Sequence, residues 1–175
     1  VSFQDSLVVF TQDEKWIVSG YDRGSINLRK STGSKGAISR SGIAADENLI
    51  YFVSDDGFYE YNGSSDEKLS SRISPLFDAC GQKTKISPIV WKGQVRFYMA
   101  SQGSPHNDTC AIYDKELKEW MLDTETYINH AVYYNDADDA HQLVEFSSLR
   151  GTAFLAEQNY HSLGAPIDFE YRLKY

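Results

Sequence analysis

The sequence predicts an all-β protein made of consecutive small antiparallel sheets, arranged as a partial or complete β-propeller. Tyr, Phe and Trp together form 14% of the chain, and aromatic residues favour the pleated, half-buried surfaces of strands. Short runs of alternating apolar and polar residues are separated by turn pairs such as Asp-Gly and Asn-Gly, which favour tight hairpins. These hairpins recur about every 40 to 50 residues, a period typical of propeller blades with four short strands each.

The first unit begins with a hairpin of two predicted strands, residues 6–11 and 15–20, joined by the polar turn 12–14. A third strand is predicted over residues 25–31. Gly and Ser dominate residues 31–42, and this composition predicts a loop.

Three further hairpins follow along the chain. Their predicted strand pairs are residues 48–54 with 57–63, 93–101 with 109–122, and 141–148 with 152–158. Helix-like spacing of apolar residues is confined to residues 67–80. Pro75 limits that helix to one or two turns, because proline cannot supply a backbone hydrogen bond inside a helix.

The second strands of the four hairpins can be aligned with one another. The alignment places four residues in register at intervals of 42, 53 and 42, namely Ile17, Tyr59, Ile112 and Phe154. The polar insert 102–108 accounts for most of the excess in the longer interval. We therefore expect these strands to be the second or third strands of consecutive sheets. The residues expected near the core between sheets are Phe10, Phe52, Phe97 and Phe146.

One strand gives a finer expectation about its two faces. Tyr59 and Tyr61 share one face because side chains alternate along a strand, and Phe58 and Glu60 share the other. Glu60 marks the wetter face, so the ring of Tyr61 is expected to be buried.

Residues 1–175 are expected to form a single β-propeller-like domain. Strand-like patterns run up to both ends of the sequence, so we expect the chain to be a fragment of a longer protein. Cys80 and Cys110 are too few for a disulfide framework and are expected to be unpaired thiols, as in a reducing cytoplasm.

Charge and composition exclude some classes of partner. The net charge of −8 disfavours direct binding to nucleic acid, which requires clustered Lys and Arg. No apolar run approaches the roughly 18 residues of a membrane span, so membrane insertion is not expected. No cofactor-binding motif is present, and we expect no cofactor.

Three segments carry a resemblance to a known class of proteins. They are "LVVFTQDEKWIVSG", "SGIAADENLIYFVSDDGFYEYNG" and "YHSLGAPIDFEYRLKY". Each resembles strand units in β-propeller-containing structural proteins of tailed bacteriophages and prophages, in tail and neck (head-closure) components. The resemblance implies a virion structural protein that is not an enzyme. It implies contacts with other virion proteins, and a location in the virion after synthesis in the bacterial host cytoplasm. "CAIYDKELKEWMLDT" also resembles kelch-like strands, which favours a propeller without indicating a function.

Catalytic and metal-binding residues are not predicted. The four His residues are scattered, without the spacing of a metal motif, and no nucleophile motif is present. The acidic segment 135–141 lacks the pattern of a calcium loop and is interpreted as a solvated hairpin tip. Trp16 and Trp120 are expected in the core between sheets, and Trp91 is expected to be exposed.

The candidate binding residues are Trp91, Tyr133 and Tyr134, because exposed aromatic residues dominate many interfaces. Aromatic residues also stack on sugars. The alternative function is therefore a receptor- or glycan-binding module of a phage tail or bacterial surface protein. A glycosidase on a propeller scaffold is the third hypothesis, and it would require a pair of carboxylates about 5 to 10 Å apart.

Overall fold

The computed structural model of the chain describes residues 1–135, 141–149, 151–156, 161–162 and 165–166. The fold is all-β, with 48% of residues in strands and 9% in helices, so the predicted fold class is confirmed at that level. Four small antiparallel sheets follow one another along the chain, and none of them closes on itself. We name them sheets A to D in chain order.

Each sheet is a meander, in which consecutive strands are neighbours. Sheet A contains β1 (Ser2–Phe3), β2 (Ser6–Phe10), β3 (Lys15–Ser19) and β4 (Asn27–Lys30). Sheet B contains β5 (Ile43–Ala45), β6 (Ile50–Ser54), β7 (Gly57–Tyr61) and β8 (Asp66–Lys68). Sheet C contains β9 (Ser87–Trp91), β10 (Gln94–Met99), β11 (Thr109–Asp114) and β12 (Glu119–Thr124). Sheet D contains β13 (Ile128–Asn135), β14 (His141–Ser147) and β15 (Ala153–Leu155), and a ribbon of β16 (His161–Ser162) and β17 (Ala165–Pro166) follows it.

A short helical connection joins sheets B and C. It consists of η1 (Ser70–Ile73), α1 (Ser74–Ala79) and η2 (Lys83–Lys85). Pro75 lies in the first turn of α1, where its missing amide hydrogen costs nothing. The prediction of a helix of one or two turns is therefore confirmed. Among the described residues, no helix combines the length and apolarity needed to cross a membrane.

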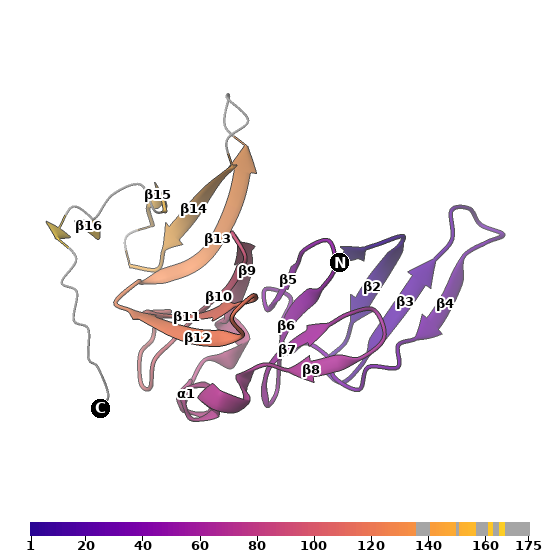
Figure 1. Cartoon of the computed structure of the whole chain (residues 1–175), viewed down its shortest axis with the longest axis horizontal. Helices are drawn as coiled ribbons and strands as arrows, with labels where there is room; N and C mark the ends of the chain where they lie inside the picture. Colours follow the sequence, from indigo (N-terminus) through magenta and orange to yellow (C-terminus); the bar gives the residue numbers. More distant parts are fainter. Residues whose placement is uncertain (136–140, 150, 157–160, 163–164, 167–175) are drawn as a thin grey trace.

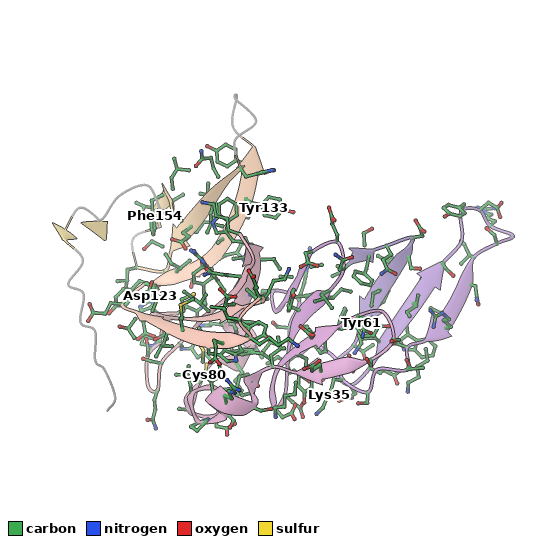
Figure 2. The ribbon with its side chains drawn as sticks, in the orientation of Figure 1. Lys35, Tyr61, Cys80, Asp123, Tyr133 and Phe154 are labelled. Carbon is green, nitrogen blue, oxygen red and sulfur yellow. The ribbon has the colours of Figure 1, made fainter. Side chains whose placement is uncertain are left out.

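The four sheets stack face to face in the order A, B, C, D; in Figure 1 sheets A, B and C follow one another from right to left, and sheet D lies above sheet C. Side chains fill the spaces between them (Figure 2). The first strands of sheets B, C and D, which are β5, β9 and β13, lie side by side.

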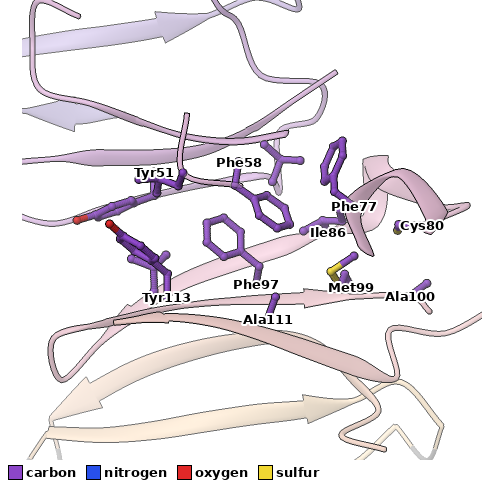
Figure 3. Close-up of a cluster of buried hydrophobic side chains, with 13 residues drawn as sticks. Tyr51, Phe58, Phe77, Cys80, Ile86, Phe97, Met99, Ala100, Ala111 and Tyr113 are labelled. Atoms are coloured by element: carbon purple, nitrogen blue, oxygen red, sulfur yellow. The ribbon is translucent and has the colours of Figure 1, made fainter. Parts of the chain in front are cut away.

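Sheet B is buried on both faces. Phe58 stacks on Phe97 of sheet C, with ring centroids 4.1 Å apart, and both belong to the cluster between sheets B and C (Figure 3). Tyr61 points the other way, into the cluster between sheets A and B. The predicted burial of Tyr61 is confirmed, and Glu60 is the one residue of β7 that is not buried, although Phe58 on the same face is fully buried.

The predicted register is correct for strands and wrong for faces. Ile17, Tyr59, Ile112 and Phe154 all lie on the third strands of their sheets. Ile17, however, pairs with Val8 and faces sheet B, whereas Tyr59 packs in the cluster towards sheet A. A shift of one residue reverses the face of every side chain on a strand. The alignment therefore displaces Tyr59 of β7 by an odd number of residues from the position that corresponds to Ile17 of β3.

Three of the four Phe residues expected in the core are there. Phe52 and Phe97 are fully buried, and Phe10 is half-buried against the cluster between sheets A and B. The expectation for Phe146 is wrong, because 41% of its surface is exposed. Its position pairs with His130, on the face of sheet D that points away from sheet C.

The single strand predicted over residues 109–122 is two strands. Asp114 Oδ1 accepts hydrogen bonds from the amides of Glu116 and Leu117, and Lys118 has a positive φ of 54°. These features form a tight turn between β11 and β12. Cys80 and Cys110 are both buried and unpaired, as expected.

Candidate interaction surface

Tyr133 and Tyr134 are the predicted binding residues that the structure leaves exposed. They lie near the end of β13, opposite Leu143 and Gln142 of β14, with 61% and 44% of their surfaces exposed. Being consecutive, they point to opposite faces of the sheet. They therefore flank one hairpin end of sheet D, where Figure 2 labels Tyr133.

Trp91 is not part of this surface, and the expectation that it is exposed is wrong. It ends β9 with 7% of its surface exposed, in the cluster between sheets C and D that includes Tyr98 and Leu143. A turn residue can still be buried when its side chain points along the apolar face of its strand. Lys92 covers the ring, with its ammonium nitrogen 5.2 Å from the centroid.

The other two tryptophans differ from each other. Trp120 packs against Phe58, Phe97 and Tyr113 and donates its indole hydrogen to the carbonyl of Leu69 at 3.2 Å, so its predicted place in the core is confirmed.

Trp16 instead pairs with Val9, which is exposed on the face of sheet A away from sheet B. Its indole donates to the Glu14 carboxylate at 2.9 Å. The prediction of a core position for Trp16 is therefore wrong.

The acidic segment 135–141, interpreted from the sequence as a solvated hairpin tip, lies outside the described residues apart from its first and last positions. Among the described parts of the chain, no three His, Cys, Asp or Glu side chains are placed to share a metal ion.

Two titratable groups with shifted pKa values owe the shift to burial and to hydrogen bonds within the fold. Burial raises the pKa of the Cys110 thiol, which therefore stays protonated and inert. Burial also raises the pKa of the Tyr59 hydroxyl to about 12, and its hydrogen bonds to the Asp56 carboxylate add to the shift.

A buried ion pair joins sheets A and B. The Lys15 ammonium lies 2.6 Å from Asp66 Oδ1 and also donates to the carbonyl of Lys35. It lies over the rings of Phe52 and Tyr61, at 4.7 and 4.8 Å from their centroids. Because Lys15 is fully buried, this arrangement holds two sheets together and offers no site to a ligand.

A groove with a volume of about 440 Å³ runs between β2 and residues 37–43. Its walls are mostly apolar, and the polar residues among them are Thr11, Gln12, Ser39 and Arg40.

The outer faces of the two end sheets are apolar, which the sequence did not predict. On sheet A these include Leu7, Val9 and Leu28, and on sheet D they include Val132, Phe146 and Leu155, all exposed. The sequence places apolar residues on both faces of these strands. The signal was missed because the sequence cannot say that a sheet lies at the end of a stack.

Comparison of the sequence with known proteins identifies no relative. The sequence matches no protein-family model and no curated protein.

Proposed function

We propose that this chain is a structural protein of a tailed bacteriophage or prophage virion, acting through protein–protein contacts in the tail or neck. We further propose that its four sheets are consecutive blades of a partial or complete β-propeller. The resemblance of the hairpin segments to phage structural proteins motivates the biological setting. The face-to-face stacking of meander sheets supports the propeller.

The observation that carries the contact function is the amount of apolar surface left exposed on sheets A and D. Soluble monomers rarely expose contiguous apolar patches of more than a few hundred Å² unless these serve an interface. Among the groups with shifted pKa values, by contrast, the Cys110 thiol is buried and the Asp56 carboxylate is bound by lysines and a tyrosine of the fold. Binding therefore fits the described surface better than catalysis.

Particles of the phage or induced prophage that encodes the chain provide the test. We expect peptides of this chain in purified virions, at a fixed ratio to the major structural proteins by quantitative mass spectrometry. Deletion of the coding sequence should yield particles that lack a complete neck or tail by electron microscopy. Absence of the chain from intact purified virions would show that the proposal is wrong.

The second candidate function is recognition of a host surface glycan or receptor. The exposed pair Tyr133 and Tyr134 favours it, because tyrosine rings at a hairpin end can stack on sugar rings. A glycan array probed with the wild-type chain and with a Tyr133→Ala, Tyr134→Ala double variant separates the two functions. A signal that the double variant loses would favour recognition, and a signal from neither protein would favour assembly.

A further inference from the structure

The turn between β7 and β8, residues 62–65, contains the only Asn-Gly pair in the sequence. Asn62 is exposed. Gly63 has a φ of 95°, a conformation that glycine adopts readily and other residues rarely adopt. The turn therefore requires glycine directly after an exposed asparagine.

The side-chain amide of Asn62 is held by the rest of the turn. Its Oδ1 atom accepts hydrogen bonds from the amide of Ser64, the hydroxyl of Ser64 and the amide of Ser65, each at 2.9 Å. Its Nδ2 atom donates to the Ser65 hydroxyl at 3.2 Å. Donors aimed at a carbonyl oxygen stabilise the negative charge that develops on it when a nucleophile adds to the carbonyl carbon. The turn thus polarises the Asn62 amide for attack at Cγ.

The backbone nitrogen of Gly63 is the nucleophile nearest in the chain to that carbon. Within the described part of the chain, the amide hydrogen of Gly63 donates to no acceptor. Glycine also has no side chain that would hinder the approach of its nitrogen to Asn62 Cγ. Because both groups belong to one short turn, their reaction is intramolecular, which gives it a high effective concentration.

The same strand carries a pair of similar sequence that is arranged differently. Asp56 precedes Gly57 at the other end of β7, where Gly57 pairs with Ser54. The ammonium groups of Lys35 and Lys68 lie 3.0 and 3.2 Å from the Asp56 carboxylate and favour its ionised form. An ionised carboxylate resists attack by a nucleophile, so Asp56 serves as an internal control for Asn62.

We propose that Asn62 is a covalent modification site, at which the folded protein deamidates and forms isoaspartate. The Gly63 nitrogen bonds to Asn62 Cγ, the bond from Cγ to Nδ2 breaks, and the amino group leaves as ammonia with the proton of the Gly63 amide. Water then opens the resulting succinimide ring. Addition at Cγ gives aspartate, and addition at the backbone carbonyl gives isoaspartate, whose main chain runs through Cβ and Cγ. The reaction consumes only water and changes no oxidation state.

The modification would act on the contact between sheets A and B, because the turn is anchored to sheet A. The Tyr61 hydroxyl donates to the Gly63 carbonyl at 2.7 Å and lies 2.7 Å from the Ser31 hydroxyl. The Thr32 hydroxyl donates to the Ser64 carbonyl. Isoaspartate inserts a methylene group into the main chain of this turn and displaces these partners. We therefore expect the modified protein to be less stable than the unmodified protein.

Incubation of the purified chain in mildly alkaline buffer, followed by peptide mapping with mass spectrometry, provides the test. We expect the peptide that contains Asn62 to gain the mass that replaces an amino group by a hydroxyl. An isoaspartyl methyltransferase should label the same peptide. Peptides that contain Asn48, which is also exposed but precedes Leu49, and Asp56 should stay unchanged. Absence of the mass gain at Asn62 would overturn the proposal.

The variant Ser64→Ala tests whether the folded turn promotes the reaction. It removes one hydrogen-bond donor to Asn62 Oδ1 and should slow deamidation about two- to tenfold, the effect of one hydrogen bond. In urea, where the turn is absent, S64A and wild type should react at the same rate. Equal rates in the folded state, or a faster reaction in S64A, would show that the turn does not promote deamidation and would overturn the proposal.

The variant Asn62→Gln tests the consequence for stability. Its longer side chain places the amide carbon one bond further from the Gly63 nitrogen, so it should keep its mass during incubation. The urea midpoint of incubated wild type should fall, and that of incubated N62Q should stay constant. Circular dichroism checks that both variants keep the wild-type β signal. The inference goes beyond the proposed function, and an unmodified Asn62 would leave the presence of the chain in virions unaffected.

Discussion

The ammonium group of Lys15 shows how one residue can hold two sheets in place. It is fully buried, and burial lowers its pKa while the Asp66 carboxylate opposes that effect. Asp66 also accepts a hydrogen bond from the amide of Lys35 at 3.0 Å. The pair thus fixes the loop after sheet A against the last strand of sheet B.

Replacing Lys15 with Met should strongly destabilise the protein. The change removes the cation and leaves the Asp66 carboxylate buried without it, a situation that costs about 3 to 5 kcal/mol. The double variant Lys15→Met, Asp66→Asn should lose less, because no uncompensated charge remains. Urea unfolding measures both. The control Arg72→Met removes a cation from an exposed pair with Glu119 and should change stability by at most about 1 kcal/mol.

Glu60 predicts a dependence of stability on pH. Burial, followed by the nearby charge of Glu67, raises the pKa of Glu60 above its ordinary value of 4.5. Between the unfolded and the raised folded pKa, the folded state binds more protons than the unfolded state, so stability falls as pH rises through this window. At neutral pH the ionised Glu60 therefore opposes folding.

Glu60→Gln should accordingly stabilise the protein at pH 7 and have little effect at pH 4. The measurement is the difference in urea midpoint between variant and wild type at the two pH values. Glu116→Gln, in an exposed turn, should show no such difference. Equal shifts at pH 4 and pH 7 would mean that the carboxylate is not the cause.

At the scale of elements, hairpins could be predicted from the sequence and the edges of sheets could not. The strands β2, β3, β6 and β7 lie within the predicted ranges, because alternation and Asp-Gly or polar turns mark them. The first strand of sheet B, Ile43–Ala45, is short and rich in small residues, so its pattern is too weak to detect. It forms because β6 offers it a pairing edge.

The direction of side chains was harder to predict than the strands themselves. In sheet B, both Phe52 and Val53 are fully buried, on opposite faces. A strand that is buried on both sides gives no alternation that distinguishes one face from the other. The burial of Phe146 likewise depends on whether another sheet follows, and it was therefore expected inside. Trp91 was expected outside for a different reason, because it lies at the turn that follows β9.

The loop of residues 31–42 makes a close contact that composition did not reveal. The amide of Ala37 donates to the carbonyl of Thr11 at 2.9 Å. A Cβ atom on Gly36 would lie 2.2 Å from that carbonyl oxygen and 2.4 Å from the carbonyl carbon of Gln12. Glycine at this position therefore lets the loop pack against the turn of the first hairpin.

Gly36→Ala should cost about 1 to 3 kcal/mol, because the backbone of the turn must move to admit the methyl group. The matched control is Gly81→Ala, where a Cβ atom would meet nothing within 4 Å. That variant should be neutral or slightly stabilising, since alanine reduces the freedom of the unfolded chain. Urea unfolding compares the two. Equal costs at both positions would contradict the close packing of the loop.

At the scale of the whole molecule, the faces between neighbouring sheets are packed, whereas the outer faces of the two end sheets are exposed. Three clusters of buried side chains fill the spaces between successive sheets. The outermost faces carry apolar rows that resemble those in the interior. The fold is thus a repeat whose packing surfaces continue beyond its last members. Apolar faces of this kind support the proposed role in protein–protein contacts.

The charge of the whole chain makes a final prediction about partners within a virion. A net charge of −8 repels the phosphate backbone, and the basic excess of residues 1–42 is only two charges. Non-specific DNA binding at physiological salt has dissociation constants of about 10⁻⁴ to 10⁻⁶ M even for proteins with basic surfaces. We therefore expect no change in the fluorescence anisotropy of a labelled duplex at protein concentrations up to about 10 µM.

The positive control is the double variant Asp5→Lys, Asp13→Lys, which adds four positive charges beside the basic residues of sheet A and should bind more than the wild type at low salt. Tight binding by the wild type, with affinity falling steeply as salt rises, would instead indicate a component that contacts packaged DNA directly.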